Sequence, residues 1–396
     1  MKYIKQFKEL SKNDAHIAGG KGASLGEMLN AGIPVPDGFV VTAETFDHFI
    51  KETDLIQEIE SILSKVDTKA IHTVDKASEE IQSLIKESSM PKDITDEVLE
   101  QFNHLGATYV AVRSSATAED GADHAWAGQL DSYLNTTKEN LFEMVQSCWA
   151  SLFTPRAIFY RYEKGLHTTH ISVAVVVQKM VNSEKSGIAF SVHPVTEDHN
   201  QIIIEAGVGL GEAIVSGAVT PDSYVVTKSP SKILDVNVNA QTKALYRIEG
   251  GGNKWVELTK EEAGQQVLDN SQVMELSEAI KGIENHYGFP CDIEWAFEDG
   301  KFYIVQSRPI TTLSNEISTP KIILEKTYTR DTSAIIQQAW THAIDTHRKN
   351  FSLNKYKDQI LTLHYINDGV IEVWEDTSWT DDLMEDGTKI LQQIIS

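Results

Sequence analysis

A β-hairpin signal close to residue 300 constrains the fold of this chain more than any other feature of its sequence. Two apolar runs, 292–297 and 302–306, flank the turn sequence Glu298-Asp-Gly-Lys301. An Asp-Gly pair between such runs is typical of a tight antiparallel turn. This part of the chain is therefore expected to belong to an antiparallel sheet.

Helices and strands are mixed along the rest of the chain. Helices are expected at 23–30, 42–50, 75–87, 93–103, 139–152, 155–163 and 271–287. Extended segments are expected at 33–41, 109–113, 171–180, 187–191, 202–205, 224–227 and 233–238. The mixture predicts an α+β fold, and 396 residues are long for a single core. A linker is expected at 314–320, directly after the part of the chain that ends near residue 313. The tail that it begins, 314–396, has a helix expected near 334–348.

Charge and composition exclude several classes of partner. The chain has 35 Lys and Arg against 58 Asp and Glu, a net charge of −23. Such an acidic chain repels a phosphate backbone, so neither nucleic acid nor an anionic membrane is expected as a partner. Its longest apolar run, 173–177, is far too short for a membrane span, and no secretory signal is visible. Cys148 and Cys291 form no Cys-x-x-Cys motif, which fits a reducing cytoplasm.

Two segments in the first third of the chain could bind phosphate. Gly19-Gly-Lys21-Gly22 precedes a helix, where backbone N–H groups can approach an anion and a lysine adds a point charge. Arg113 stands at the end of a strand and is followed by small hydroxyl residues, a pattern that suits a phosphate clamp. An exposed loop and a polar turn would give the same two patterns.

Two later segments could also belong to a binding site: a glycine-rich run and the two strands of the hairpin. The run Gly207-Val-Gly209-Leu-Gly211 follows a strand, but Glu212 occupies the last glycine position of a dinucleotide fingerprint, so a structural turn is the default interpretation. On the hairpin, the polar residues of otherwise apolar strands are Asp292, Glu294, Gln306 and Arg308. Carboxylate and amide oxygens suit Mg²⁺, and an arginine beside them could reach phosphates; a solvent-facing hairpin is the alternative.

The length of the hairpin turn decides whether Glu294 and Gln306 lie on one face. Successive side chains of a strand point to opposite faces. A two-residue turn would place these two side chains on opposite sides of the sheet. A three-residue turn that ends on Gly300 at positive φ would place both, together with Arg308, on one face. We predict the three-residue turn.

In this order, the motifs resemble the N-terminal nucleotide-binding part of the phosphoenolpyruvate synthase and pyruvate phosphate dikinase family. The chain is similar to rifampicin phosphotransferase as well. The resemblance covers residues 1–313. The motifs that carry it are Gly20-Lys21-Gly22-Ala-Ser-Leu-Gly-Glu27, Val35-Pro-Asp-Gly-Phe39, Val112-Arg-Ser-Ser-Ala-Thr-Ala-Glu-Asp120, Ala127-Gly-Gln129, Val177-Gln178-Lys-Met180, Gly209-Leu-Gly-Glu212, Gly217-Ala-Val-Thr-Pro-Asp222, Asp292-Ile-Glu-Trp295 and Ile304-Val-Gln-Ser-Arg-Pro309.

The resemblance implies an ATP-grasp fold with ATP and Mg²⁺ between two lobes, 1–195 and 196–313, and an extension at 314–396. It gives catalytic roles to Lys21, Arg113 and Arg308, with Lys21 and Arg113 on the phosphates and Arg308 on the terminal ones. Glu294 and Gln306 would hold the metal. The remaining nucleotide-binding residues would be Ser132, Gln178, Lys179, Met180 and Val181, with the adenine near 178–181, and Glu212, with the ribose.

Two departures from the family define what this chain can do. Family members transfer phosphate from ATP to a histidine on a swivelling domain, and neither that histidine motif nor the pyruvate-binding barrel is found here. The resemblance therefore implies a cytoplasmic kinase module that phosphorylates a histidine domain supplied in cis or in trans. The alternatives are an ATP module of the rifampicin-inactivating type and a non-catalytic nucleotide-binding module that interacts with partners; an ATP-grasp ligase is a further possibility.

Overall fold

The computed structural model describes residues 2–117, 131–166, 171–311, 313, 321–322, 362–366 and 370–374. The chain separates into two compact units, Met1–Leu313 and Ser314–Ser396. The Ala127-Gly-Gln129 motif and the helix expected near 334–348 lie outside the described residues. In the second unit, the described strands β14 (Lys321–Ile322), β16 (Val370–Trp374) and β15 (Thr362–Ile366) pair antiparallel in that order.

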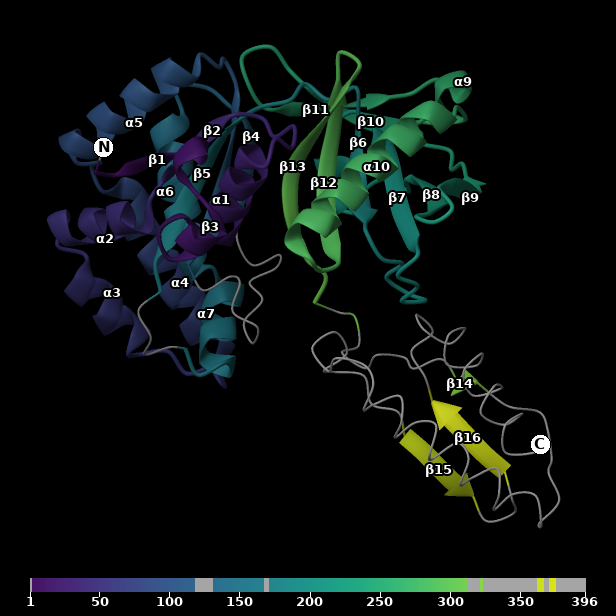
Figure 1. Cartoon of the computed structure of the whole chain (residues 1–396). Helices are drawn as coiled ribbons and strands as arrows, with labels where there is room; N and C mark the ends of the chain where they lie inside the picture. Colours follow the sequence, from purple (N-terminus) through teal and green to yellow (C-terminus); the bar gives the residue numbers. More distant parts are fainter. Residues whose placement is uncertain are drawn as a thin grey trace, which may run out of the picture. The chain divides into compact units, whose positions relative to one another are not determined.

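The first lobe of the first unit is built on a five-stranded antiparallel sheet with the order β1-β2-β5-β3-β4 (Figure 1). Its strands are β1 (Ile4–Gln6), β2 (Gly38–Val41), β3 (Val110–Ala116), β4 (Ser132–Thr136) and β5 (Val173–Lys179). Its helices are α1 (Ala15–Asn30), α2 (Ala43–Glu52), α3 (Ile56–Leu63), α4 (Ile71–Glu87), α5 (Lys92–Leu105), α6 (Leu141–Ala150) and α7 (Pro155–Glu163), with short 3₁₀ turns at Phe7–Glu9, Lys12–Asp14 and Ser151–Phe153.

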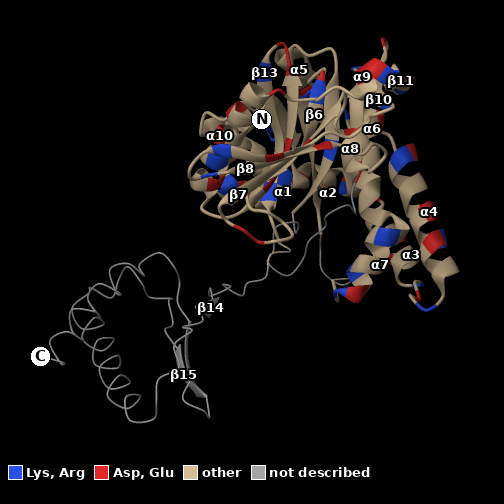
Figure 2. Ribbon diagram, turned by 90° about the vertical axis from the view of Figure 1, so that its right-hand side faces the viewer, with Lys and Arg blue, Asp and Glu red and all other residues tan. Residues whose placement is uncertain are grey.

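Strand β5 shows how the two faces of this sheet are used. Val173, Val175 and Val177 pack in a core with Trp149 of α6, and Ala174 and Val176 pack in a second core with α1. Side chains alternate between faces, so a continuous run of valines is buried on both sides. Both signs of charge lie along the outer helices α4 and α7 (Figure 2). None of the described helices is long and apolar enough to cross a membrane.

The second lobe contains a six-stranded sheet with the order β13-β12-β6-β7-β8-β9. Its strands are β6 (Lys185–Phe190), β7 (Gln201–Val208), β8 (Asp222–Thr227), β9 (Lys232–Asn237), β12 (Cys291–Glu298) and β13 (Lys301–Pro309). Helix α10 (Asn270–Tyr287) packs against this sheet, and apolar side chains of both form one core. The remaining elements of the lobe are α8 (Glu212–Val215), β10 (Lys243–Arg247), β11 (Asn253–Glu257) and α9 (Lys260–Ala263). Because β6 pairs in this sheet, the change of lobe falls between β5 and β6, ahead of the expected boundary at residue 195.

The β12–β13 turn differs from the expectation. Glu298 pairs with Lys301, so the turn has two residues, Asp299 and Gly300, at φ 50° and 74°. The predicted three-residue turn is wrong, although Gly300 has the expected positive φ. A β-bulge lies between Trp295 and Glu294 and leaves Val305 without a partner in the register. An extra residue in one strand reverses the face of every later residue in that strand, so Glu294 pairs directly with Gln306.

Helix α1 begins earlier than the segment 23–30 predicts, because the glycine-rich segment is helical apart from one residue. Gly19 has φ 64° and ψ 171° and interrupts the helix. A Cβ at Gly19 would lie 2.2 Å from Oγ of Ser115, so the two backbone segments approach as closely as glycine allows. Beyond this break, the N–H of Lys21 donates to Ser115 Oγ at 3.1 Å. The interruption fixes the start of α1 against β3.

Two carboxylates in the first unit, those of Asp222 and Glu27, each hold together segments that are far apart in the sequence. Asp222 is fully buried and accepts hydrogen bonds from the backbone N–H groups of Asn239 and Val267 and from the hydroxyl of Tyr224. Glu27 of α1 accepts from the backbone N–H of Lys12 at 3.1 Å and lies 2.9 Å from Nε2 of His286, on α10. The Lys12 hydrogen bond, with the His286 contact, lowers the pKa of Glu27.

Candidate functional site

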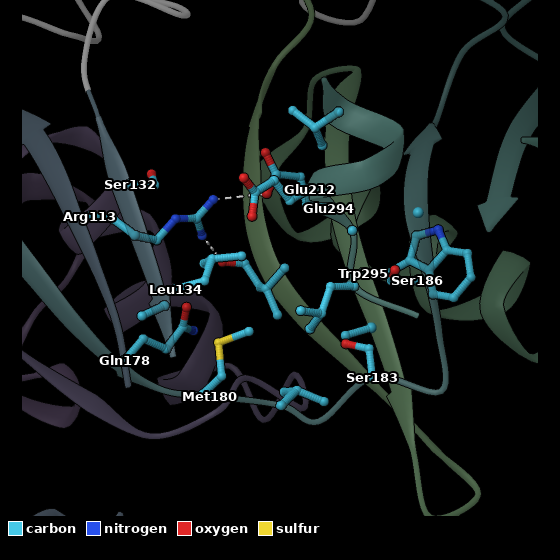
Figure 3. A pocket seen from close by; sticks show the side chains of 18 of the residues that line it. Arg113, Ser132, Leu134, Gln178, Met180, Ser183, Ser186, Glu212, Glu294 and Trp295 are labelled. Carbon is cyan, nitrogen blue, oxygen red and sulfur yellow. Dashed lines mark hydrogen bonds and ion pairs between the residues drawn. The ribbon is translucent and has the colours of Figure 1, made fainter. Parts of the chain in front are cut away.

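A cavity of about 270 Å³ lies between the two sheets of the first unit (Figure 3). The first sheet and the segment after β5 contribute Ala111, Arg113, Ser132, Leu134, Gln178, Lys179, Met180, Val181 and Ser183. The second lobe contributes Ser186, Gly187, Leu210, Gly211, Glu212, Val215, Ser216, Glu294, Trp295, Ala296 and Val305. The cavity thus has one wall from each lobe, and any ligand in it would touch both.

Arg113 of β3 organises the polar side of the cavity. Its Nη2 atom donates to Glu294 Oε2 at 2.8 Å, and its Nη1 atom donates to the carbonyl of Val305 at 3.0 Å (Figure 3). The Nη2 atom also donates to Gln306 Oε1 at 2.9 Å. Its Nε atom is buried and has no hydrogen-bond partner among the described residues. A buried donor without a partner costs free energy, so the described residues leave this position of Arg113 without an acceptor.

The opposite side of the cavity is mostly apolar. Met180, Val181 and Leu210 line it, and Val181 and Leu210 are buried. Gln178 is buried as well and donates from Nε2 to the carbonyl of Pro36. The backbone N–H of Met180 is bonded to the carbonyl of Tyr109 at 3.0 Å, which ties this segment to the first sheet. A flat apolar group flanked by a few polar atoms would fit here.

Two further predicted residues lie at the edge of the cavity. Glu212 is the first residue of α8, is exposed, and accepts a hydrogen bond from Nδ2 of Asn253 at 3.0 Å. Ser132 begins β4, directly across from Arg113 in the register. Both residues line the cavity and carry a side-chain oxygen.

Three predicted residues do not line the cavity. Gln306 is buried and reaches the site through Arg113. Lys21 lies on α1 beside β3. Arg308 is largely exposed and forms two hydrogen bonds, at 2.8 and 2.6 Å, to one oxygen of Asp292. Burial raises the pKa of Asp292, and Arg308 opposes this effect.

Several lining residues were not assigned by sequence reasoning. Leu134 lies in the short strand β4 and Ser183 in the connection after β5, and neither stands in a motif. Leu210 stands inside the Gly209-Leu-Gly-Glu212 motif, but no role was assigned to it. Trp295 stands inside the Asp292-Ile-Glu-Trp motif and could have been identified from it. Val305 has the pattern of an ordinary strand residue, so only the bulge brings its carbonyl to Arg113.

The donor set suits a divalent cation of the Mg²⁺ type. Among the described residues no group of three or more His, Cys, Asp or Glu side chains could hold a metal ion. Glu294 Oε2 and Gln306 Oε1 nevertheless converge on one positive atom, Nη2 of Arg113. Mg²⁺ keeps several waters and needs only one or two protein oxygens beside substrate phosphates, so this pair fits it.

Comparison with known proteins gives one family and several relatives. The family model described as "Pyruvate phosphate dikinase, AMP/ATP-binding domain" matches residues 15–328. A protein of Methanocaldococcus jannaschii named "Probable phosphoenolpyruvate synthase" is 48% identical over 79% of this chain and 27% of its own length. A protein of the same name from Archaeoglobus fulgidus is 50% identical over 78% of this chain and 41% of its own.

A third relative has a different name. The "Rifampicin phosphotransferase" of Bacillus cereus is 38% identical over 78% of this chain and 36% of its own length. The chain therefore spans less than half the length of each of these three relatives.

Proposed function

The chain belongs to the family of the pyruvate phosphate dikinase AMP/ATP-binding domain, and we propose that its two lobes form an ATP-grasp fold that binds ATP and Mg²⁺ in the cavity. One observation carries the proposal. A guanidinium that is only 11% exposed, with one donor that has no partner among the described residues, stands beside two converging oxygen ligands, opposite an apolar side of the same cavity. This arrangement separates a place for phosphates and metal from a place for a base.

Each end of the nucleotide has candidate residues. The adenine would lie along 178–181, where the wall is apolar and anchored to the first sheet. Glu212 would accept hydrogen bonds from the ribose hydroxyls, and Ser132 would offer its hydroxyl near the phosphates. Arg113 would bind phosphate oxygens through Nε and the guanidinium plane, which matches phosphate geometry.

Lys21 and Arg308 would complete the phosphate site from outside the described cavity. Lys21 lies on α1, whose backbone is fixed to Ser115 on the same strand as Arg113. Arg308 lies across from Asp292, two residues from Gln306 and so on the same face. A nucleotide that reaches along this face would meet Lys21, Arg113 and Arg308. Their positive charges would offset the negative charge of its phosphates.

Glu294 and Gln306 would hold the metal. Mg²⁺ bound there would neutralise phosphate charge during transfer. In the structure both oxygens are bonded to Arg113, so binding of the metal requires Arg113 to release them. The arginine would then turn its donors to the phosphates, and the same three side chains would serve the protein with and without nucleotide.

The whole reaction is proposed from the relatives' names. We propose a module of a cytoplasmic phosphoenolpyruvate synthase type of enzyme, which converts ATP, pyruvate and water to AMP, phosphoenolpyruvate and phosphate through a phosphohistidine on another domain, in cis or in trans. Two relatives with that name support this assignment. The relative named rifampicin phosphotransferase supports a second candidate, the same ATP module acting toward an antibiotic hydroxyl.

The first test is nucleotide binding by the 396-residue chain. Calorimetry with ATP–Mg²⁺ should show one site, and Arg113→Ala and Lys21→Ala should weaken it while the far-UV circular dichroism is unchanged. Absence of heat at millimolar ATP–Mg²⁺ would refute the proposal.

The second test separates the two candidate reactions. A phosphohistidine domain from a relative of either type is added in trans with labelled ATP. Pyruvate-dependent formation of AMP and phosphoenolpyruvate supports the first candidate. Labelled rifampicin with no pyruvate dependence supports the second.

A further inference from the structure

The β10–β11 hairpin, residues 243–257, connects the two lobes at the edge of the cavity. It forms a separate two-stranded sheet and belongs in sequence to the second lobe. Figure 1 shows β11 beside β4 of the first lobe. None of the sequence motifs predicted a role for this hairpin, and its purpose is not explained by nucleotide binding alone.

Glycines allow the hairpin to approach both lobes closely. Gly209 has φ 83°, and a Cβ there would lie 2.4 Å from the carbonyl oxygen of Leu245, which accepts from the backbone N–H of Leu210 at 2.9 Å. At the turn, Gly250 to Gly252 all have positive φ. A Cβ at Gly251 would lie 3.1 Å from the carbonyl oxygen of Asn135. The hairpin is thus seated on the second lobe and touches the first.

Side chains hold the turn on the first lobe. The backbone N–H of Gly250 donates to the hydroxyl of Tyr109 at 3.1 Å, and the guanidinium of Arg247 lies 4.5 Å from the centre of the Tyr109 ring. Tyr109 immediately precedes β3, and its carbonyl binds the N–H of Met180 on the apolar side of the cavity. The contact therefore joins the hairpin to the segment proposed for adenine.

Asn253 links this contact to the proposed ribose ligand. The buried Asn135 of β4 donates from Nδ2 to Oδ1 of Asn253, and Asn253 donates from Nδ2 to Glu212 Oε2 at 3.0 Å. Both functions of the Asn253 amide are used, one toward each lobe. Glu212 is exposed and stands on a helix of only four residues, so its carboxylate has few other constraints.

We propose that Asn253 is a positioning residue that orients Glu212 for the two ribose hydroxyls, and that its bond to Asn135 makes this orientation depend on the two lobes being together. The proposal rests on the proposed function. Asn253 does not line the cavity, so it acts through Glu212. Ribose recognition would then be strongest only when the hairpin is docked on both lobes.

The experiment compares ATP–Mg²⁺ with 2′,3′-dideoxy-ATP–Mg²⁺ by calorimetry on the whole chain. Asn253→Asp keeps an oxygen for Asn135 but removes the donor to Glu212. A hydrogen bond to a charged group is worth about tenfold in affinity, so ATP should bind about tenfold more weakly. The dideoxy analogue should change by less than about twofold. Lys254→Ala, on the adjacent exposed residue, is the matched control and should change neither.

A combined variant tests whether the effect passes through Glu212. In a Glu212→Gln background, Asn253→Asp should add less than about twofold to the loss of ATP affinity. Equal weakening of ATP and the analogue, or full additivity with Glu212→Gln, would overturn the inference. If Asn253→Asp does not fold, Asn253→Gln, which displaces the donor, must lower the selectivity for ATP over the analogue.

Failure of this inference can be told from failure of the proposed function. A wild-type chain that binds neither nucleotide refutes the proposed function. A wild-type chain that prefers ATP, with the same preference in the Asn253 variants, refutes only the positioning role.

Discussion

Breaking the contact between Arg113 and Glu294 should measurably destabilise the nucleotide-free protein. The side chains are 11% and 22% exposed, and the Nη2–Oε2 distance is 2.8 Å. Exposed ion pairs contribute about 0–1 kcal/mol, and removal of one partner of a buried pair costs about 3–5 kcal/mol. At intermediate burial we expect about 2 kcal/mol for Arg113→Ala, and a coupling free energy of about 1–2 kcal/mol with Glu294→Ala.

The assay is a double-mutant cycle from urea unfolding followed by tryptophan fluorescence. The wild type, the two single variants and the double variant are compared, with m-values checked for constancy. Arg308→Ala is the control, because its pair with Asp292 is more exposed on the arginine side, and its own loss should stay below about 1 kcal/mol. A coupling below about 0.3 kcal/mol between Arg113 and Glu294 would refute the pairing in the nucleotide-free protein.

Three other predictions concern stability. Asp222→Ala leaves two buried donors and one partly buried donor without an acceptor and should cost about 3 kcal/mol in urea unfolding, whereas Asp235→Ala, at an exposed position, should cost less than about 0.5 kcal/mol. Gly19→Ala should lower the melting temperature more than Gly32→Ala, because both have positive φ but only Gly19 lacks room for a Cβ. Because the pKa of Glu27 is lowered in the folded state, its carboxylate contributes stability at pH values above its unfolded-state pKa near 4.5. This contribution is lost as the pH falls through the folded-state pKa, so Glu27→Gln should flatten the acid limb of a pH–stability curve.

Local sequence signals predicted much of the fold because each rests on nearby residues. The helix expected at 155–163 matches α7 because Pro155 fixes its first turn, and the N-cap Thr154 accepts from the N–H of Ala157. The helix expected at 271–287 matches α10, which ends at Gly288 in the left-handed region. For the site, motif resemblance selected eight of the twenty residues that line the cavity, with members on both of its sides. Their chemical roles remain predictions.

Features that depend on distant parts of the chain were not predictable in the same way. The sequence around the three glycines 250–252 indicates only a loop, and its docking depends on Tyr109 and Asn135. The expected boundary at residue 195 places β6 in the first lobe, whereas β6 pairs with β7 and β12 of the second sheet. The sequence could not show this, because β6 is short and both of its partners come later in the chain. The bulge is the clearest case, since Val305 has no local feature that distinguishes it from a paired strand residue.

The bulge shows how the site and the register depend on one contact. A regular hairpin with the observed two-residue turn would pair Glu294 with Val305 and turn Gln306 to the other face. The extra residue brings Gln306 opposite Glu294, and the carbonyl of Val305 is bonded to Arg113, 192 residues away in sequence. The metal-type oxygen pair therefore exists because β13 contains one residue more than β12 requires.

Two single-residue deletions should separate the register from the contact. Deleting Val305 restores a regular hairpin in which Glu294 still faces Gln306 and Trp295 still faces Ile304, so only the hydrogen bond to Arg113 is lost, at about 1.5–3 kcal/mol. Deleting Tyr303 removes the bulge equally, but it moves the fully buried Ile304 to the cavity face and puts Val305 in its core position opposite Trp295, an exchange of isoleucine for valine that costs about 0.5–1.5 kcal/mol more. Urea unfolding of both variants measures the difference. Equal stability would show that the bulge does not set the register, and a Val305 deletion that also abolishes ATP–Mg²⁺ binding would show that the carbonyl contact, beyond the Glu294–Gln306 pair, is needed by the site.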